Sequence, residues 1–488
     1  MGSLQKRTKV LEDAEDRISK LSDSILCHIL SFLPTKDAGR TSILSTRWKY
    51  LFFSSPTLDF DDSLRLYLGK CNLNSRRNFV NFVYRVLLLR SSLHLNRFRL
   101  KCRVKHNDPH VKTWISAAVC RNVQELELKL DISHDLTEDG NSGLLPNDLL
   151  NCRALVVLKL DVNGDLNVPS DVSFPSLKIL HLQSLFIDYD SYKRILSGCP
   201  VLEDLLTYDC MFVQKVQAFD ISIPTLKRLT LGLQYLSTRG NFYESEVVID
   251  APCLQYFRYS GNAAKNYTLK GLTSLAEAHI CIVLSACQDR LSYGSPLSDL
   301  FKAISMVESL HLSGCSVRVS NNLLLLLSCM KVVKDTQCWL PTFPNLTRLE
   351  LDSDHDTGLV LLPQLLYSSP KLEALVIGEG FVDVKESLIN FPDSSSGCLS
   401  HLKEVELKEF NGKEDELQLV EYLLESAEVL EKMTISYFGL EQFEMDLHIG
   451  KKLLTFPRHS KACRIFLNVD LKDETNFLNH FWYMPEPV

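Results

Sequence analysis

A leucine pattern recurs along most of this 488-residue chain and constrains its fold more than any other feature. The pattern is L-x-x-L-x-L, in which apolar positions alternate with polar ones as they do in a half-buried β-strand. Clear copies begin at Leu155, Leu177, Leu226, Leu346 and Leu372, and weaker copies begin at Val123, Leu202, Leu254, Val307, Leu402 and Leu430. One copy cannot bury its apolar face alone, so successive copies must stack. The sequence therefore predicts an α/β solenoid with a curved parallel sheet.

The residues between the core leucines are expected to face away from the core, because successive side chains of a strand point to opposite faces. These residues are chemically varied, and a curved sheet that presents such a mixture is suited to recognising another protein. The predicted partner-binding residues are Lys159, His181, Arg228, Tyr256, Arg258, His311, Arg348 and Glu350.

The segment before the repeats has a helical period. Apolar residues from Leu21 to Leu33 recur at steps of three and four, and Pro34 is expected to end this helix. A second helical stretch is expected from Asp37 to Leu51, followed by a linker that carries Asp59, Asp61 and Asp62. About 45 residues make a small core, so we expect this unit to complete its core against a partner. A helix, a strand and a second helix are expected over residues 76–121.

The segment from Arg97 to Lys105 alternates strictly and places five cations on one face of a predicted strand: Arg97, Arg99, Lys101, Arg103 and Lys105. One interpretation is a patch for an acidic or phosphorylated partner. The other, which we favour, is a solvated edge strand whose charges prevent aggregation, with Glu125 and Glu127 of the next strand neutralising part of it.

Composition and motifs exclude several classes of protein. The net charge of −7 argues against broad nucleic-acid binding. The fifteen cysteines include no C-x-x-C pair, which predicts reduced thiols and no structural zinc site. No metal-ligand, phosphate-loop or nucleophile motif occurs, so we expect no catalytic residue, metal or cofactor. The apolar run of note, Leu323 to Leu327, is far too short to span a membrane.

Several segments resemble the plant F-box/leucine-rich-repeat family. The stretches Asp16–Asp23, Ile29–Ala38 and Thr41–Leu51 resemble its F-box, and Leu58–Asp62 is similar to the segment that follows that F-box. The segment Leu196–Glu203 is similar to the family's repeat signature, and the segment from Leu402 to Ile435 resembles its FBD domain.

The resemblance implies a domain order. It comprises a three-helix F-box at 14–62, a horseshoe of irregular leucine-rich repeats with a helical lead-in at 76–395, a repeat-like FBD cap at 396–470 and a tail at 471–488. Residues 1–13 are charged and without a period, which predicts a disordered tail.

The resemblance also implies a function. An F-box docks on a Skp-type adaptor and through it on a cullin, while the repeats hold a protein substrate for ubiquitination. The chain would then be a non-catalytic substrate receptor of an SCF-type ubiquitin ligase, cytoplasmic and/or nuclear. The expected adaptor-binding residues are Leu21, Ile25, Ile29, Leu30, Leu33, Pro34, Ile43, Leu44, Trp48 and Leu51.

Two departures from the family pattern leave an alternative open. Ser22 stands where the family usually has Pro, and Gly39 stands where it usually has Val. Both changes can weaken the F-box, since Gly disfavours a helix interior by about 1 kcal/mol. The alternative is a stand-alone leucine-rich-repeat binding module with a degenerate F-box, outside any ligase. A small-molecule receptor, as in the auxin and jasmonate receptors of this architecture, is less favoured because their arrays are longer and more regular.

Overall fold

A computed structural model of the chain separates into two compact units. Unit 1 comprises residues 1–177 and 194–199, and unit 2 comprises residues 178–193 and 200–488. The structure describes residues 17–18, 20–62, 73–90, 94–105, 108–133, 145–212, 216–233, 245–284, 294–313, 327–328, 340–352, 362–378, 399–438 and 450–470. The two predicted terminal tails, 1–13 and 471–488, lie outside these residues.

Unit 1 begins with three short helices and a 3₁₀ turn. These are α1 (Asp23–Ser31), α2 (Thr35–Arg40), η1 (Thr41–Ile43) and α3 (Thr46–Ser54). Pro34 occupies the N-cap of α2, so α2 begins before Asp37, the residue expected to start it. The Ser45 side chain accepts a hydrogen bond from the Trp48 backbone N–H and caps α3. The single helix expected from Asp37 to Leu51 is therefore interrupted and restarted at Ser45.

The rest of unit 1 is a parallel sheet in the order β1–β2–β3–β4 with helices beside it. The elements are β1 (Thr57–Asp61), α5 (Leu73–Leu89), β2 (Arg97–Lys105), α6 (Pro109–Val119), β3 (Glu125–Ser133), η2 (Asn147–Asn151) and β4 (Val157–Asp165). The helix, strand and helix expected over residues 76–121 are confirmed. The expected linker around Asp59 is instead strand β1, because Leu58 and Phe60 are buried and alternate with Asp59 and Asp61.

Unit 2 is built on a longer parallel sheet in the order β5–β6–β9–β11–β13–β14–β16–β17–β18–β19–β20. Its strands are β5 (Ile179–Ile187), β6 (Asp204–Tyr208), β9 (Arg228–Leu233), β11 (Tyr256–Asn262), β13 (Glu277–Leu284), β14 (Ser309–Ser313), β16 (Arg348–Asp352), β17 (Ala374–Ile377), β18 (Glu404–Leu407), β19 (Lys432–Phe438) and β20 (Arg464–Asp470). Two shorter strands are β7 (Met211–Phe212), parallel to β5, and β15 (Leu327–Ser328), antiparallel to β13. The predicted α/β class with a large parallel sheet is confirmed.

The core of unit 2 follows the leucine pattern. Neighbouring copies are in register, so that Leu310 of β14, Leu349 of β16 and Leu375 of β17 form one buried row. In strand β13, Ala278 occupies the position of the second leucine of the pattern, opposite Leu310 of β14. The alanine makes the leucine pattern hard to recognise in the sequence, but the buried row continues through this strand, since Ala278 is buried like its neighbours.

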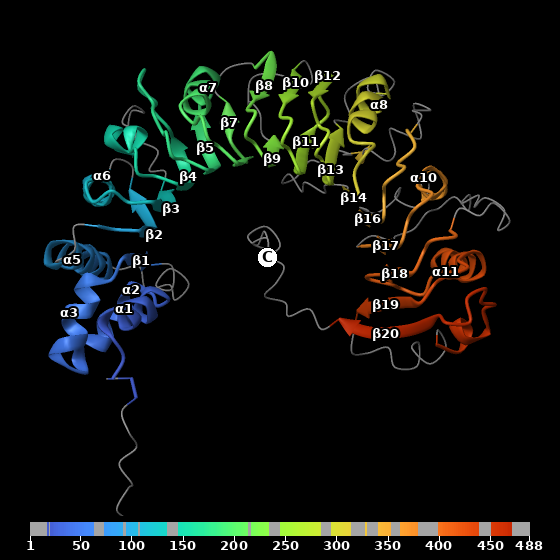
Figure 1. Ribbon diagram of the computed structural model, residues 1–488, viewed down its shortest axis with the longest axis horizontal. Helices are drawn as coiled ribbons and strands as arrows, with labels where there is room; N and C mark the ends of the chain where they lie inside the picture. Colours follow the sequence, from blue (N-terminus) through green and yellow to red (C-terminus); the bar gives the residue numbers. More distant parts are fainter. Residues whose placement is uncertain are drawn as a thin grey trace, which may run out of the picture. The chain divides into compact units, whose positions relative to one another are not determined.

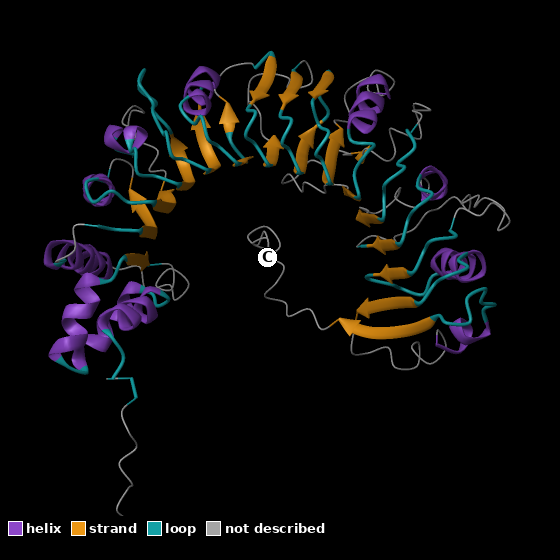
Figure 2. Cartoon of the chain, viewed as in Figure 1, coloured by secondary structure: helices purple, strands orange, loops and turns teal. Residues whose placement is uncertain are grey.

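The other covering elements of unit 2 lie on one side of this sheet. Helices α8 (Gly294–Ala303), α10 (Leu362–Ser368) and α11 (Glu414–Ser426) stand on its convex side, and no described helix covers the opposite face (Figures 1 and 2). Between α7 (Tyr189–Ser197) and α8, a second parallel sheet takes the helices' place. It consists of β8 (Ala218–Ser222), β10 (Glu246–Asp250) and β12 (Asn266–Lys270), three strands that the leucine pattern did not predict.

None of the helices in the part of the chain that the structure describes is both long and apolar enough to cross a membrane.

Candidate interaction surfaces

The helical unit of α1, α2 and α3 buries one half of its apolar side chains. Leu26, Leu30, Trp48, Leu51 and Phe52 pack inside the helical unit. Three of the residues expected to contact an adaptor are therefore assigned a different role: Leu30, Trp48 and Leu51 are only 1%, 8% and 5% exposed. The apolar stripe of α1 is wide. The side chains along one edge of the stripe, Leu26 and Leu30, pack inside the helical unit and hold the helices together.

The other half of the apolar side chains is exposed. We call this set the exposed apolar set, and it comprises Ile25, Ile29, Phe32, Leu33, Ile43 and Leu44. All of these except Phe32 were expected adaptor contacts. Pro34 is also exposed, and Leu21 is half-buried. Phe32 was missed although it lies three residues after Ile29, which puts it on the same helix face.

An ion pair holds the start of α1 against α3. The Arg47 guanidinium donates to Asp23 Oδ1 at 2.6 Å and to the backbone carbonyl of Leu21 at 2.6 Å. This contact adds to the packing of the buried side chains of α1 and α3, so the exposed apolar set lies on a folded helical unit.

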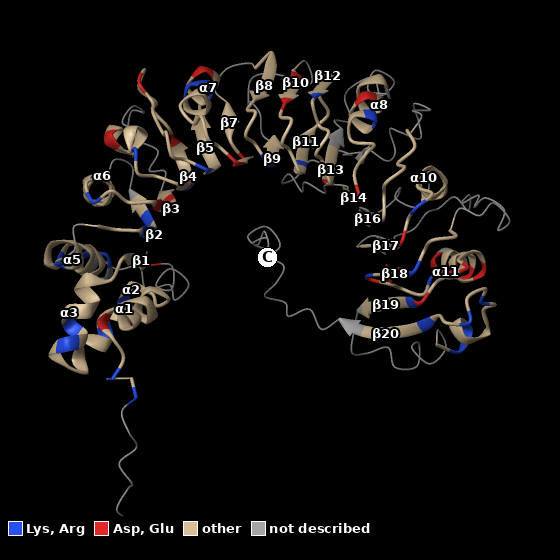
Figure 3. Ribbon diagram, in the orientation of Figure 1, with Lys and Arg blue, Asp and Glu red and all other residues tan. Residues whose placement is uncertain are grey.

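The basic strand β2 lies between β1 and β3, not at an edge of the sheet (Figure 3). Arg99 contacts Glu127 at 3.0 Å on one side and Asp59 at 3.5 Å on the other. Lys101 lies 3.7 Å from Asp61. The acidic residues expected in a linker thus flank the basic strand.

The outer pairs of β2 complete the neutralisation. Arg97 lies 3.7 Å from Glu125 and 3.4 Å from Glu127, and Arg103 lies 2.8 Å from Asp131. The expected pairing with Glu125 and Glu127 is confirmed, whereas the expected edge position is wrong. The side chain of Lys105 lies outside the described residues. The four described cations are matched by carboxylates, so this strand is not an open site for an anion.

The uncovered face of unit 2 carries a row of interacting side chains that crosses seven strands, from β5 to β16. We call it the polar row, and it comprises His181, Asp204, Arg228, Tyr256, His279, His311 and Asp352.

The polar row begins with ion pairs and continues with rings. His181 Nε2 lies 3.3 Å from Asp204, and Arg228 Nε lies 3.7 Å from the same carboxylate. The Arg228 guanidinium sits 4.3 Å above the centre of the Tyr256 ring, a cation–π geometry. The rings of Tyr256 and His279 then lie 5.2 Å apart.

The row ends on a second imidazole and a carboxylate. The rings of His279 and His311 are 4.9 Å apart, and His311 Nε2 hydrogen-bonds Asp352 at 2.7 Å. Burial lowers the pKa of His279, as does the nearby His311, while the hydrogen bond to Glu277 opposes them. Burial likewise raises the pKa of Tyr256. The centre of the row is therefore a polar, largely uncharged surface.

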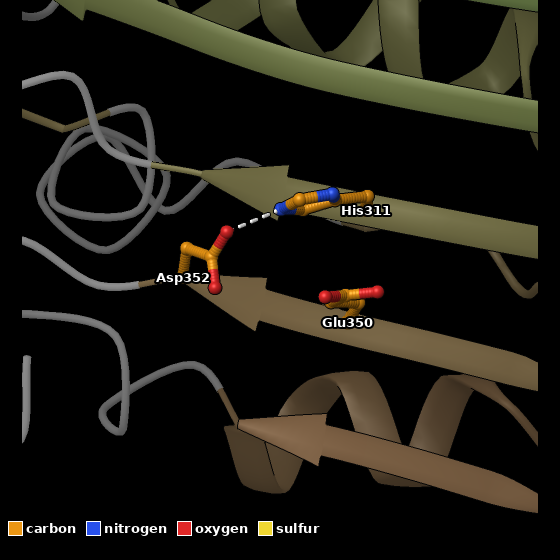
Figure 4. A group of neighbouring side chains, drawn as sticks. All are labelled: His311, Glu350 and Asp352. Atoms are coloured by element: carbon orange, nitrogen blue, oxygen red, sulfur yellow. Dashed lines mark hydrogen bonds and ion pairs between the residues drawn. The ribbon is translucent and has the colours of Figure 1, made fainter. Parts of the chain in front are cut away.

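A further set of ion pairs adjoins the end of the row. Glu350 lies 3.7 Å from Arg348 and 3.3 Å from Lys408. The sequence motifs predicted no metal-ligand cluster, but His311, Glu350 and Asp352 come together on β14 and β16 (Figure 4). They were invisible as a cluster because His311 and Asp352 are 41 residues apart in the sequence.

The predicted substrate-binding residues hold the expected register. Arg228 and Arg258 are half-buried and Arg348 is exposed, which confirms that none of these side chains points into the core. Lys159 is half-buried on β4 and belongs to unit 1, whereas the other predicted residues belong to unit 2. We missed Asp204, Asp352 and Lys408, which occupy the same alternating positions. Asp204 lies inside the weak copy at Leu202, whereas Asp352 and Lys408 directly follow the last apolar residue of their copies and could have been found by extending them.

The described cysteines give no sign of an activated nucleophile. Burial raises the pKa of the Cys199 thiol to about 12, where it stays protonated at neutral pH. Eight described cysteines are free thiols. Cys281 on β13 is disulfide-bonded, which departs from the prediction of reduced thiols throughout.

Three family models match the chain in the order F-box, repeats, FBD. A model described as an F-box domain matches residues 18–59. One described as the LRR repeats of FBD-associated F-box protein At5g56370 matches residues 111–288, and one described as FBD matches residues 392–435.

Relatives from Arabidopsis thaliana match nearly the whole chain. F-box/LRR-repeat protein At4g14096 is 33% identical over 94% of this chain and 96% of its own length. F-box/LRR-repeat protein At3g59200 is 32% identical over 93% of this chain and 88% of its own length. An Arabidopsis F-box/FBD/LRR-repeat protein is 33% identical over 87% of this chain and 84% of its own length.

Proposed function

Since this chain belongs to the plant F-box/LRR-repeat family and carries an FBD segment, we propose that it is a non-catalytic substrate receptor of an SCF-type ubiquitin ligase. In this proposal the F-box docks on a Skp-type adaptor, which links to a cullin. The uncovered face of unit 2 holds a protein substrate. The proposed location is cytoplasmic and/or nuclear.

The observation that carries the proposal is the exposed apolar set on a closed helical unit. Leu44 is 66% exposed and Ile43 is 86% exposed, although both are large apolar side chains. Several large apolar side chains left exposed on one folded unit are typical of a partner site. Fully burying one such side chain contributes about 1.5–3 kcal/mol, so a docking partner would gain about tenfold or more in affinity from each.

The adaptor proposal is tested with the full chain and a purified Skp-type adaptor. We expect the double substitution Ile29→Asp and Leu44→Asp to abolish capture of the adaptor. The matched control is Leu88→Asp, because Leu88 lies on α5 of the same unit, outside the F-box helices, and is 79% exposed. Capture of the adaptor at the wild-type level by the double variant would remove the main support for the proposal.

The substrate proposal is tested by trapping. When the cullin arm is disabled in cells, bound substrates should accumulate on the receptor instead of being degraded. We expect the trapped proteins to depend on the polar row, so Arg228→Glu should change the set that is recovered. If a folded Arg228→Glu chain recovers the same set of trapped proteins as wild type, the substrate site does not lie on this face.

The alternative function is a stand-alone binding module with a degenerate F-box, and Ser22 and Gly39 motivate it. Ser22 is the N-cap of α1 but its side chain makes no capping hydrogen bond. Gly39 lies inside α2, where an added Cβ would meet only the Phe52 ring at 3.4 Å. Both helices form despite these residues. A wild-type chain that fails to bind any Skp-type adaptor would favour this alternative.

A further inference from the structure

We propose that His311, Glu350 and Asp352 form a binding site for a first-row divalent transition metal of the zinc class. The proposal does not depend on adaptor binding, because all three residues lie on unit 2. It adds a site that neither the motifs of the sequence nor the family resemblance suggests.

The backbone places the three side chains on one face. Glu350 and Asp352 are two residues apart on β16, so their side chains point to the same side of the sheet. His311 lies directly opposite Glu350 in the register of β14 and β16. One ligand atom from each residue lies within 4.8 Å of the others. Figure 4 shows Asp352 and His311 pointing toward one another, with Glu350 beside them on β16.

A glycine on the next strand makes room for one of the ligands. Gly378 directly follows β17, and a Cβ added there would come within 1.7 Å of Asp352 Oδ1. No side chain larger than hydrogen fits at position 378 while Asp352 keeps this position. The Asp352 carboxylate thus lies against Gly378 through Oδ1. Its other oxygen, Oδ2, lies 2.7 Å from His311 Nε2.

The donor set selects the class of metal. One imidazole nitrogen and two carboxylate oxygens suit zinc and its neighbours, whereas calcium and magnesium prefer oxygen ligands alone. The site is half-buried, and Lys408 and Arg348 contact Glu350 only at 3.3 Å and 3.7 Å. A divalent cation can displace such partly exposed pairs, because exposed ion pairs contribute little to stability.

Three protein ligands leave one position of a tetrahedral zinc ion for water or for a side chain of a partner. That position would lie on the uncovered face of unit 2, at the end of the polar row that His311 and Asp352 form. A bound metal would join β14 to β16 and would add a positive charge to the largely uncharged centre of the row.

The test titrates the metal-free full chain with Zn²⁺ by calorimetry and with Co²⁺ by optical absorption. We expect one tight Zn²⁺ site and a Co²⁺ spectrum without thiolate charge-transfer bands, which separates this site from the free cysteines. His311→Gln, Asp352→Asn and Gly378→Ala should each weaken Zn²⁺ binding by at least about 10–100-fold. Gly378→Ala keeps every ligand atom but displaces the Asp352 carboxylate.

The matched control is His181→Gln, because His181 forms the same imidazole–carboxylate contact with Asp204 without belonging to the three-ligand group. It should leave Zn²⁺ binding unchanged. Zn²⁺ binding that survives both His311→Gln and Asp352→Asn, a thiolate spectrum with Co²⁺, or tighter binding of Mg²⁺ than of Zn²⁺ would each overturn the proposal.

Discussion

We expect Glu416 to couple the stability of the FBD region to pH. It lies in the first turn of α11, and its Oε2 accepts hydrogen bonds from the backbone N–H groups of Lys413 at 2.9 Å and Asn411 at 3.0 Å. Its Oε1 is buried without a hydrogen-bond partner. Burial raises the pKa of Glu416 to about 7, although the hydrogen bonds from the backbone oppose this.

The raised pKa predicts a loss of stability as the pH rises. Below about pH 4.5 the carboxyl is protonated in both the folded and the unfolded chain and contributes no pH dependence. Between about pH 4.5 and 7 the unfolded chain releases the proton while the folded chain keeps it, so the free energy of unfolding falls. From the ordinary value of 4.5 to about 7, the loss is about 3 kcal/mol. Above about pH 7 it stays constant.

The substitution Glu416→Gln replaces the titratable carboxyl group by a neutral amide. The amide oxygen can still accept the two hydrogen bonds from the backbone N–H groups of Lys413 and Asn411. Relative to wild type, the variant should therefore gain about 3 kcal/mol of unfolding free energy between pH 4.5 and pH 8. The assay is urea unfolding of both chains at several pH values in this window. The matched control is Glu414→Gln, because Glu414 is exposed on the same helix and pairs only with Lys452 among the described residues. A wild-type pH dependence in Glu416→Gln would refute the reasoning.

Other predictions concern stability and partner choice. Leu30→Ala should lower the free energy of unfolding of the F-box unit by about 2–5 kcal/mol in denaturant titrations, and a cost under about 1 kcal/mol would place Leu30 on the surface. Gly39→Ala should raise helix stability by up to about 1 kcal/mol, since an alanine Cβ meets Phe52 at an ordinary contact distance; a lower melting temperature would contradict this. Arg99→Gln should change stability by less than about 1 kcal/mol, because its ion pairs are partly exposed, and a larger loss on melting would show a structural role. Arg258→Glu should alter the set of trapped proteins with unchanged circular dichroism, whereas an unfolded variant would mean that the side chain supports the core.

Much of the candidate surface was predictable from alternation alone. The period of two placed His181, Arg228, Tyr256 and His311 on the uncovered face, because a strand has only two faces and the leucines occupy the other. The same rule would have included Asp352, had the copy at Leu346 been extended by one more residue.

The sequence by itself determined the repeating parallel strands, their buried leucine rows and the helical unit before them, because these depend on local periodicity. The tertiary structure alone decided which half of the F-box stripe is buried, since that choice depends on how α1 packs against α3. It also decided that β1 flanks β2, so that Asp59 and Asp61 neutralise a strand that looks basic in the sequence. The convergence of His311 with Asp352 was likewise beyond sequence spacing, because strand register, not distance along the chain, brings them together.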